Sequence, residues 1–397
     1  MDWDPEVDTP ATIAIIGAGP AGVEAALYAR FLGYFVMLFD TRRVGHRLLA
    51  CGDELLARPW SEVTSPLGLA ALTAQGTAKE LPAGDARVSY RQYVEQYLIP
   101  VARTDLLYES VQINSPVVSI SRTCCGSGQV VSLEQRAEQE FRLLIDSQQR
   151  GEYTQLADVV LDCSGLGRLP GLASGGGLAV GERASLGHML LGRVDVLGKH
   201  RARLAGKHAL MYGRDWAACA NALDIVKLAR ETPGTRATWI VPKQLDGTDP
   251  LRLPSDASDE FASAAQRLLT NQDSDSPIGC VKAWGIEAAR FDETEGWRVR
   301  LQVEEEETVD VLGANFINCR DASRDWSLTH ALPLATDLAA EGLTAEPHYY
   351  VLGHKAVESD AAFAIPQAFE HIKQVFARIG GRAELDLYDT VRRHAEG

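Results

Sequence analysis

Residues 12–40 read TIAIIGAGPAGVEAALYARFLGYFVMLFD, and this stretch decides the fold. The apolar run Thr12–Ile16 is typical of a buried strand, and Val23–Leu32 has the apolar spacing of a helix. A second apolar run, Tyr34–Phe39, predicts the next strand. The glycine-rich turn Gly17–Gly22 therefore joins a strand to a helix within a predicted strand–helix–strand unit.

The small residues of this turn have the spacing that a dinucleotide requires. Gly17 permits the tight turn out of the strand, and Gly19 lets the backbone approach a pyrophosphate. Gly22 and Ala26 let the helix and the strand pack closely. The helix N-terminus presents free N–H groups to the phosphates, and Asp40 ends the second strand where an acid accepts hydrogen bonds from ribose hydroxyls. The stretch predicts a dinucleotide-binding unit.

The composition is that of an ordinary globular protein. The chain has 397 residues, 46% hydrophobic and 23% charged, which suggests two or three domains. A net charge of −15 argues against binding to nucleic acid or to an anionic membrane surface. The acidic start lacks a secretory pattern, no run is long and apolar enough for a membrane helix, and the cytoplasm is the expected location. Seven cysteines without a C-x-x-C pair suggest no disulfide framework.

A second strand–turn–helix pattern occupies the middle of the chain. It runs from the strand His208–Tyr212 through Gly213 into a helix that ends near Ala229, and Thr238–Val241 is the next expected strand. Residues 169–182 are dense in glycine and predict a crossing loop. We expect a first domain in two segments, 1–200 and 321–397, with a second domain, 201–320, inserted between them.

Four blocks of sequence resemble one family. Besides the first turn, they are Pro59-Trp60 with Ser65-Pro-Leu-Gly68, the run Ala157-Asp-Val-Val-Leu-Asp-Cys-Ser-Gly165, and Glu346-Pro-His-Tyr-Tyr-Val-Leu-Gly353-His-Lys. In this order they are similar to blocks of the two-dinucleotide-binding flavoproteins. These comprise the FAD-dependent pyridine-nucleotide-disulfide oxidoreductases, among them thioredoxin-reductase-like members, and their flavin-monooxygenase relatives.

The resemblance implies an α/β fold, with a three-layer, Rossmann-like FAD-binding domain and an inserted second Rossmann-like nucleotide domain. It also implies an FAD-dependent oxidoreductase that acts on an unidentified small molecule, with NADH or NADPH as a candidate electron donor. The implied FAD contacts come from the first turn, the end of the second strand and positions near both crossovers. They are Gly17, Ala18, Gly19, Pro20, Ala21, Gly22, Asp40, Arg42, Val117, Gly165, Gly353 and His354. Many relatives have Asp where His354 stands.

The second turn departs from the nicotinamide-binding pattern. Gly213 is present and Ala218 can replace the packing glycine, but Asp215 brings bulk and negative charge to the position that should face a pyrophosphate. Arg320 also stands where relatives have glycine. Either this domain is retained for structure, or a cation such as Lys243 compensates and binds the 2′-phosphate of NADPH. The choice between NADP and NAD stays open.

Cys51 is the candidate catalytic residue, because a single cysteine near this position serves a disulfide-reductase branch of the family. Its alternative is a buried structural thiol. The functional alternatives are therefore a single-cysteine disulfide reductase and a non-catalytic flavoprotein that has lost its nicotinamide site. The nine histidines have no metal-ligand spacing, so no metal is expected. A homodimer is left open.

Overall fold

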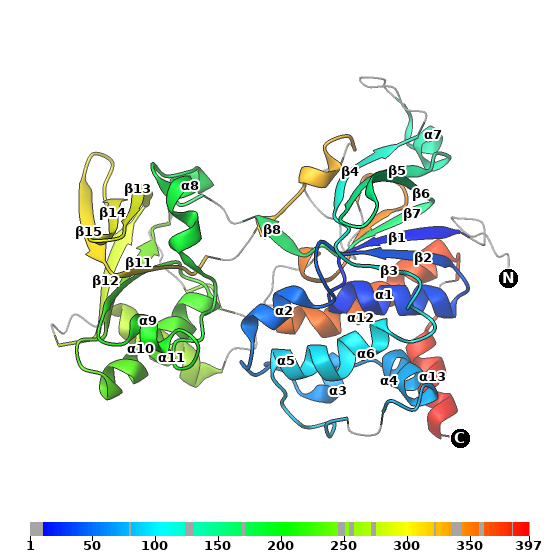
Figure 1. The fold of residues 1–397 in the computed structure, drawn as a ribbon, viewed down its shortest axis with the longest axis horizontal. Helices are drawn as coiled ribbons and strands as arrows, with labels where there is room; N and C mark the ends of the chain where they lie inside the picture. The colour runs from blue at the N-terminus through cyan, green and yellow to red at the C-terminus, as the bar shows by residue number, and fades with distance from the viewer. Residues whose placement is uncertain are drawn as a thin grey trace. The chain divides into compact units, whose positions relative to one another are not determined.

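The computed structural model divides the chain into two compact units. Unit 1 comprises residues 1–167 and 324–397, and unit 2 comprises residues 168–323 (Figure 1). The described residues are 11–78, 81–123, 131–168, 171–244, 251–253, 258–270, 275–320, 323–332, 334, 344–356, 361–382 and 384–396. None of the helices in these ranges is long and apolar enough to cross a membrane.

Unit 1 is built on a parallel sheet of five strands in the order β18-β7-β1-β2-β3. The strands are β1 (Thr12–Ile16), β2 (Phe35–Phe39), β3 (Val111–Gln112), β7 (Val159–Asp162) and β18 (Tyr349–Val351). Strand β1 lies in the middle, with β2 on one side and β7 on the other. The chain therefore continues from β1 to β2 on one side of the sheet and later returns to β7 on the other side. Such a change of direction is the switch point at which open α/β sheets bind ligands.

Alternate residues of β1 face two different cores, which makes unit 1 three-layered. Ile13 and Ile15 pack with the helices, whereas Ala14 and Ile16 pack with the antiparallel sheet β4-β5-β6. The strands of that sheet are β4 (Val117–Arg122), β5 (Phe141–Ser147) and β6 (Gly151–Ala157). Figure 1 shows α1 and α12 on one side of the parallel sheet and β4–β6 on the other. The predicted α/β, three-layer architecture is confirmed.

Helices of different lengths complete unit 1. They are α1 (Pro20–Phe31), α2 (His46–Cys51), α3 (Trp60–Val63), α4 (Pro66–Ala74), α5 (Tyr90–Tyr93), the π-helix η1 (Val94–Leu98), α6 (Ile99–Ala102), α7 (Leu133–Ala137), η4 (Ser327–Thr329), η6 (Gly353–Lys355), α12 (Ala361–Ile379) and α13 (Leu387–Glu396). Helix α1 begins three residues before the expected start because Pro20 fits the first turn of a helix. The crossovers between the units carry β8 (Leu166–Arg168) and β17 (Ser323–Arg324).

Unit 2 repeats this plan. Its parallel sheet has the order β12-β11-β10-β16-β9, and an antiparallel sheet, β13-β14-β15, shares a core with it. The strands are β9 (Leu190–Leu191), β10 (His208–Tyr212), β11 (Arg236–Pro242), β12 (Ile278–Ala283), β13 (Gly285–Asp292), β14 (Gly296–Gln302), β15 (Thr308–Gly313) and β16 (Asn315–Asn318). The helices are η2 (Ser174–Gly176), α8 (Glu182–Ser185), η3 (Leu186–His188), α9 (Arg201–Leu204), α10 (Trp216–Glu231) and α11 (Asp259–Thr270).

The boundaries of the two compact units differ from the boundaries of the expected domains. Residues 168–200, expected in the first domain, lie in unit 2. The cause is β9, which pairs in parallel with β16 and so extends the second sheet by one strand. A strand of two residues carries no periodicity that a sequence could reveal.

Helix α1 of unit 1 carries a buried acid. Glu24 of α1 is 2% exposed, and its Oε1 has no hydrogen-bond partner among the described residues. Burial raises the pKa of Glu24 to about 7, and the nearby hydroxyls of Ser65, Tyr388 and Tyr97 offset only part of this effect. The folded protein therefore holds this proton more tightly than the unfolded chain does.

We expect Glu24→Gln to change the pH dependence of stability. The wild-type protein loses stability as pH rises from the unfolded pKa of 4.5 to the folded pKa of about 7, and the loss levels off above it. The full loss corresponds to about 3 kcal/mol. Thermal unfolding should show the variant more stable than wild type at pH 8, with a much smaller gap at pH 5. Glu95→Gln, an exposed acid on η1, is the matched control; equal curves for wild type and Glu24→Gln would contradict the burial effect.

Candidate functional site

The first turn of unit 1 is packed so closely that two of its glycines cannot be replaced. Gly17 has φ +101°, and a Cβ added there would lie 2.6 Å from the carbonyl oxygen of Cys163 at the end of β7. A Cβ on Gly22 would lie 1.8 Å from the carbonyl oxygen of Gly17. The backbone of β1, α1 and β7 thus meets at the switch point without intervening side chains.

Gly19 is different, because protein packing does not require it. Its φ of −83° suits any residue, and a Cβ added there would meet no atom within 4 Å. It stands at the N-cap of α1 without a side-chain cap, so the N-terminus of a 12-residue helix faces open space. Free N–H groups and the helix dipole at such an end attract a phosphate, and the space left by Gly19 fits the pyrophosphate of a dinucleotide.

Asp40 is tied to the same turn. Its Oδ2 accepts a hydrogen bond of 2.7 Å from the N–H of Ala18, and its Oδ1 accepts one of 2.9 Å from the N–H of Arg42. The Nδ1 of His46 lies 3.2 Å from Oδ1. The carboxylate is 8% exposed, so its first task is to hold the turn and the start of α2 in place.

The two later glycines of the predicted site come to this turn. Gly353, at φ +68°, packs so that an added Cβ would lie 2.7 Å from Cβ of Ala21. Gly165, at φ +71°, directly follows the segment that packs on Gly17, and its nearest neighbour is the guanidinium of Arg47 at 3.5 Å. His354 is half-buried beside Gly353 in η6.

The segment before β4 runs beside the end of β2. The N–H of Ser115 donates to the carbonyl of Asp40 at 2.9 Å, and that of Asn114 donates to Arg42 at 2.8 Å. Val117 follows as the buried first residue of β4, paired with Ile145. The structure therefore gathers the first turn, Asp40, Arg42, Gly165 and Gly353 around one switch point, with Val117 at its margin.

A buried ion pair braces the same edge of the sheet. The ammonium of Lys355 lies 2.5 Å from Oδ2 of Asp162, and both side chains have no solvent exposure. The hydroxyl of Tyr349 also donates to Oδ2 at 2.7 Å, and Lys355 donates to the carbonyl of Asp325 at 2.7 Å. Because the charges are paired and hydrogen-bonded, the pair can be buried, and it fixes β7, β18 and the returning chain together.

Sequence reasoning missed His46, Arg47 and Lys355. Arg47 donates to the carbonyl of Leu166 beside Gly165, and His46 reaches Asp40. The signal was present, because basic residues at 42, 43, 46 and 47 follow the acid that ends β2. Lys355 directly follows the predicted Gly353 and His354, but nothing in the sequence indicated its distant partner.

The second turn copies the backbone of the first but not its side chains. Gly213, at φ +146°, follows β10 as Gly17 follows β1. Asp215 is the N-cap of α10 with φ −81° and ψ 175°, close to the φ −83° and ψ −174° of Gly19. Ala218 is fully buried at the position of Gly22. The carboxylate of Asp215 therefore stands where unit 1 leaves open space.

Lys243, the candidate ligand for a 2′-phosphate, has partners in unit 2. Its ammonium lies 2.6 Å from Oε1 of Glu304 and donates to the carbonyl of Val303. The cation is thus partly neutralised by an acid of the segment between β14 and β15.

Cys51 is the last residue of α2 and is partly buried against the first core. Its Sγ lies 3.9 Å from the carbonyl oxygen of Arg47. None of the five described cysteines forms a disulfide: Cys51, Cys163, Cys219, Cys280 and Cys319. Cys124 and Cys125 lie outside the described residues. Among the described side chains, no three of His, Cys, Asp or Glu group as a metal site would require.

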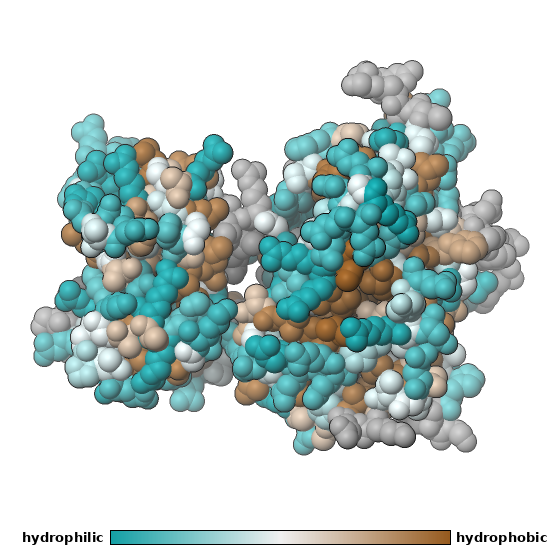
Figure 2. Space-filling model, in the orientation of Figure 1, coloured by the Kyte–Doolittle hydropathy of each residue, from teal (hydrophilic) through white to brown (hydrophobic). Residues whose placement is uncertain are grey.

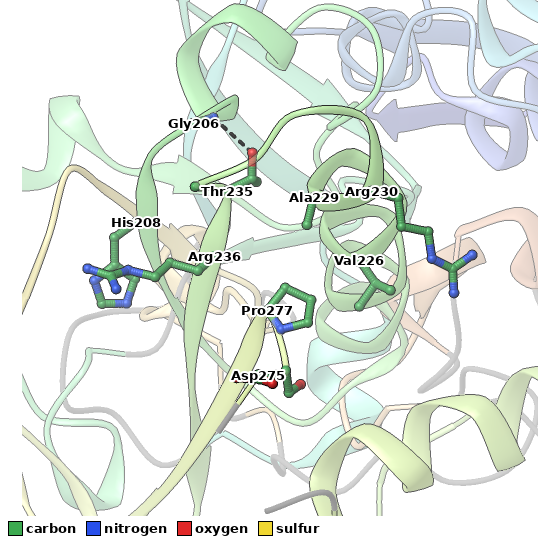
Figure 3. A pocket seen from close by; sticks show the side chains of 11 residues that line it. Gly206, His208, Val226, Ala229, Arg230, Thr235, Arg236, Asp275 and Pro277 are labelled. Atoms are coloured by element: carbon green, nitrogen blue, oxygen red, sulfur yellow. Dashed lines mark hydrogen bonds between the residues drawn. The ribbon is translucent and has the colours of Figure 1, made fainter. Parts of the chain in front are cut away.

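The surface has a hydrophobic band on unit 1 and a cleft in unit 2. Figure 2 shows a band of hydrophobic residues across the face of unit 1 between its helices and its antiparallel sheet. In unit 2, a cleft of about 760 Å³ includes His208, Arg236 and Pro277 in its lining (Figure 3). The cleft lies at the amino ends of β10, β11 and β12, which is the edge opposite to the one where such sheets bind nucleotides.

Solved structures share this fold. No family model and no curated protein sequence matches the chain. The bacillithiol disulfide reductase of Bacillus cereus is similar with a TM-score of 0.62 at 13% identity, over 94% of this chain and 99% of that one. The FAD-bound cadaverine monooxygenase of Erwinia amylovora has a TM-score of 0.61 at 11% identity, over 94% of this chain and 95% of that one. The ornithine N-hydroxylase of Kutzneria sp. 744, solved with reduced FAD, NADP+ and L-ornithine, has a TM-score of 0.59 at 13% identity, over 94% of this chain and 100% of that one.

These likenesses extend over nearly the full length of each chain. The protein therefore has the two-unit α/β fold of disulfide reductases and flavin-dependent N-hydroxylases. This agrees with the fold that the order of its sequence blocks implied.

We expect Gly22→Ala and Gly19→Ala to differ sharply in stability. The new methyl group would collide with the carbonyl oxygen of Gly17 in the first variant, whereas it enters open space in the second. Overpacking of this kind costs about 3 kcal/mol, while alanine at an N-cap costs about 1 kcal/mol or less relative to glycine. Chemical denaturation of both variants measures this, and a loss of stability in Gly19→Ala as large as in Gly22→Ala would show that the turn is packed otherwise.

Proposed function

We propose that unit 1 binds FAD non-covalently at its switch point, and that the protein is an FAD-dependent oxidoreductase acting on a small molecule. The observation that carries the proposal is Gly19. This glycine is not needed for packing, and its absent side chain leaves room for a pyrophosphate in front of the N-terminus of α1. The shared fold with a monooxygenase solved with FAD supports the choice among dinucleotides.

The residues of the chain have separable tasks in this proposal. The N–H groups at the start of α1 would bind the pyrophosphate, and the dipole of the helix would offset its charge. Asp40, held by Ala18 and Arg42, would accept from the ribose. Gly165 and Gly353 would give the rest of the cofactor close access to bare backbone. When bound, FAD supplies two-electron chemistry at its flavin ring.

The paired charges Asp162 and Lys355 would serve as scaffold. The ammonium already has the carboxylate, the hydroxyl of Ser164 and the carbonyl of Asp325 as partners. Its contribution would be to keep the carboxyl ends of β7 and β18 in register, so that Gly165 and Gly353 stay on the same side of the turn.

We expect the purified protein to be yellow, and Gly19→Asp to lose the cofactor. Aspartate would place bulk and negative charge against the pyrophosphate, with a repulsion of about 1 kcal/mol in water and several times that in a partly buried site. The absorption spectrum after gel filtration measures retained flavin. Affinity should fall about tenfold or more.

The matched control is Gly279→Asp. Gly279 is exposed on the edge strand β12 of unit 2, and an added Cβ would meet nothing within 4 Å, so the same substitution is made at an open position outside unit 1. It should keep full flavin content. A folded wild-type protein that binds no FAD on reconstitution would refute the proposal, as would equal flavin content in the two variants.

We expect Cys51→Ser to leave flavin reduction unchanged, because Cys51 packs against the core at the end of α2. Anaerobic photoreduction and reoxidation of the variant and wild type, followed by absorbance, measures this. A long-wavelength band in the wild type that disappears in Cys51→Ser would instead indicate a thiolate beside the flavin and favour the single-cysteine disulfide reductase.

A further inference from the structure

The carboxyl edge of the second sheet carries the same switch point as unit 1. The chain passes from β10 to β11 on one side, and β16 lies on the other. Sheets of this kind bind a dinucleotide at this edge, with the pyrophosphate at the N-terminus of the first helix, which is α10 in unit 2. We infer that unit 2 excludes a nicotinamide dinucleotide, because segments of its own chain fill this edge. The inference builds on the proposed function and concerns the electron donor.

A short strap, residues 251–253, lies against the turn. Arg252 donates its N–H to the carbonyl of Arg214 at 3.1 Å, and it forms a parallel bridge with Asp215. Leu251 and Leu253 pack against the core beneath. The backbone of the strap thus lies directly beside the turn. Asp215 is buried there, with 9% of its surface exposed.

Arg320 fills the switch point between β10 and β16. Its guanidinium stacks over the ring of Tyr212 at 4.9 Å and donates to the carbonyl of Gly171. Its backbone N–H lies 3.2 Å from the Cβ position of Gly213. In unit 1 the corresponding residue is Ser164, and Gly165, which carries no side chain, follows it. The two units therefore have the same backbone plan, but the residue after the cysteine that follows the strand is Arg320 in unit 2 and Ser164 in unit 1.

The cation that could recognise a 2′-phosphate is also engaged, since Lys243 pairs with Glu304. The pyrophosphate position, the switch point and the phosphate-binding cation of unit 2 all have partners within the chain. A nicotinamide dinucleotide bound at unit 2 would then not be the electron donor of unit 1. Asp215, Arg320 and the strap are the residues that determine this specificity.

Calorimetric titration of the full-length, FAD-loaded protein with NADPH, and separately with NADH, tests the inference. We expect no binding by wild type at about 1 mM nucleotide. We expect the double variant Asp215→Gly/Arg320→Gly to gain affinity for the nucleotide. Adding Leu251→Ser/Leu253→Ser releases the strap and should raise the affinity further. The total gain of the quadruple variant should be about tenfold or more. Asp215→Asn, which removes charge but keeps bulk, should gain less than Asp215→Gly.

Circular dichroism confirms that each variant is folded before titration. Micromolar binding of either nucleotide by wild type would overturn the inference. So would a folded quadruple variant that gains no affinity, because the contacts would then not be what excludes the nucleotide. Flavin content is measured separately by absorbance. A protein without FAD would refute the proposed function, while the titration of unit 2 would still decide the inference.

Discussion

Gly22 has no room for a side chain because the carbonyl oxygen of Gly17 stands where its Cβ would be. Gly17 is in turn pressed against the carbonyl of Cys163. These two contacts bring β1, α1 and β7 to within backbone distance of one another. The position of Gly165, the hydrogen bonds of Asp40 to the turn and the approach of Gly353 to Ala21 all depend on that closeness. The cofactor site that we propose lies where three pieces of backbone meet without side chains between them.

The two units share a backbone conformation at the start of this helix, but different side chains surround it. Gly19 and Asp215 have nearly the same dihedral angles, and each begins the helix after the first strand of its sheet. The difference lies in what surrounds them. Unit 1 leaves the helix end bare, whereas unit 2 places a carboxylate, a strap and an arginine there. Fold likeness to an enzyme solved with both FAD and NADP+ therefore does not establish two nucleotide sites.

The sequence predicted what is local and missed what is tertiary. Both turns were located correctly, because tight turns and close helix packing require small residues at fixed spacing. The layered architecture followed from the family resemblance that the order of the sequence blocks carries. The assignment of residues 168–200 could not be predicted, because it depends on the pairing of a two-residue strand, β9. The stacking of Arg320 on Tyr212 depends on the direction of a side chain in the folded protein, which no sequence pattern encodes.

The ion pair of Asp162 and Lys355 bears on the order in which the chain folds during synthesis. Asp162 ends a central strand, but its partner lies 193 residues later, beyond the whole of unit 2. Until residues 349–355 leave the ribosome, the first sheet lacks β18 and this carboxylate has no cation. An unpaired charge opposes burial, so unit 1 must wait in an incomplete state. Unit 2 is a continuous segment and can fold while unit 1 waits. The unit that begins first in the chain is thus completed last.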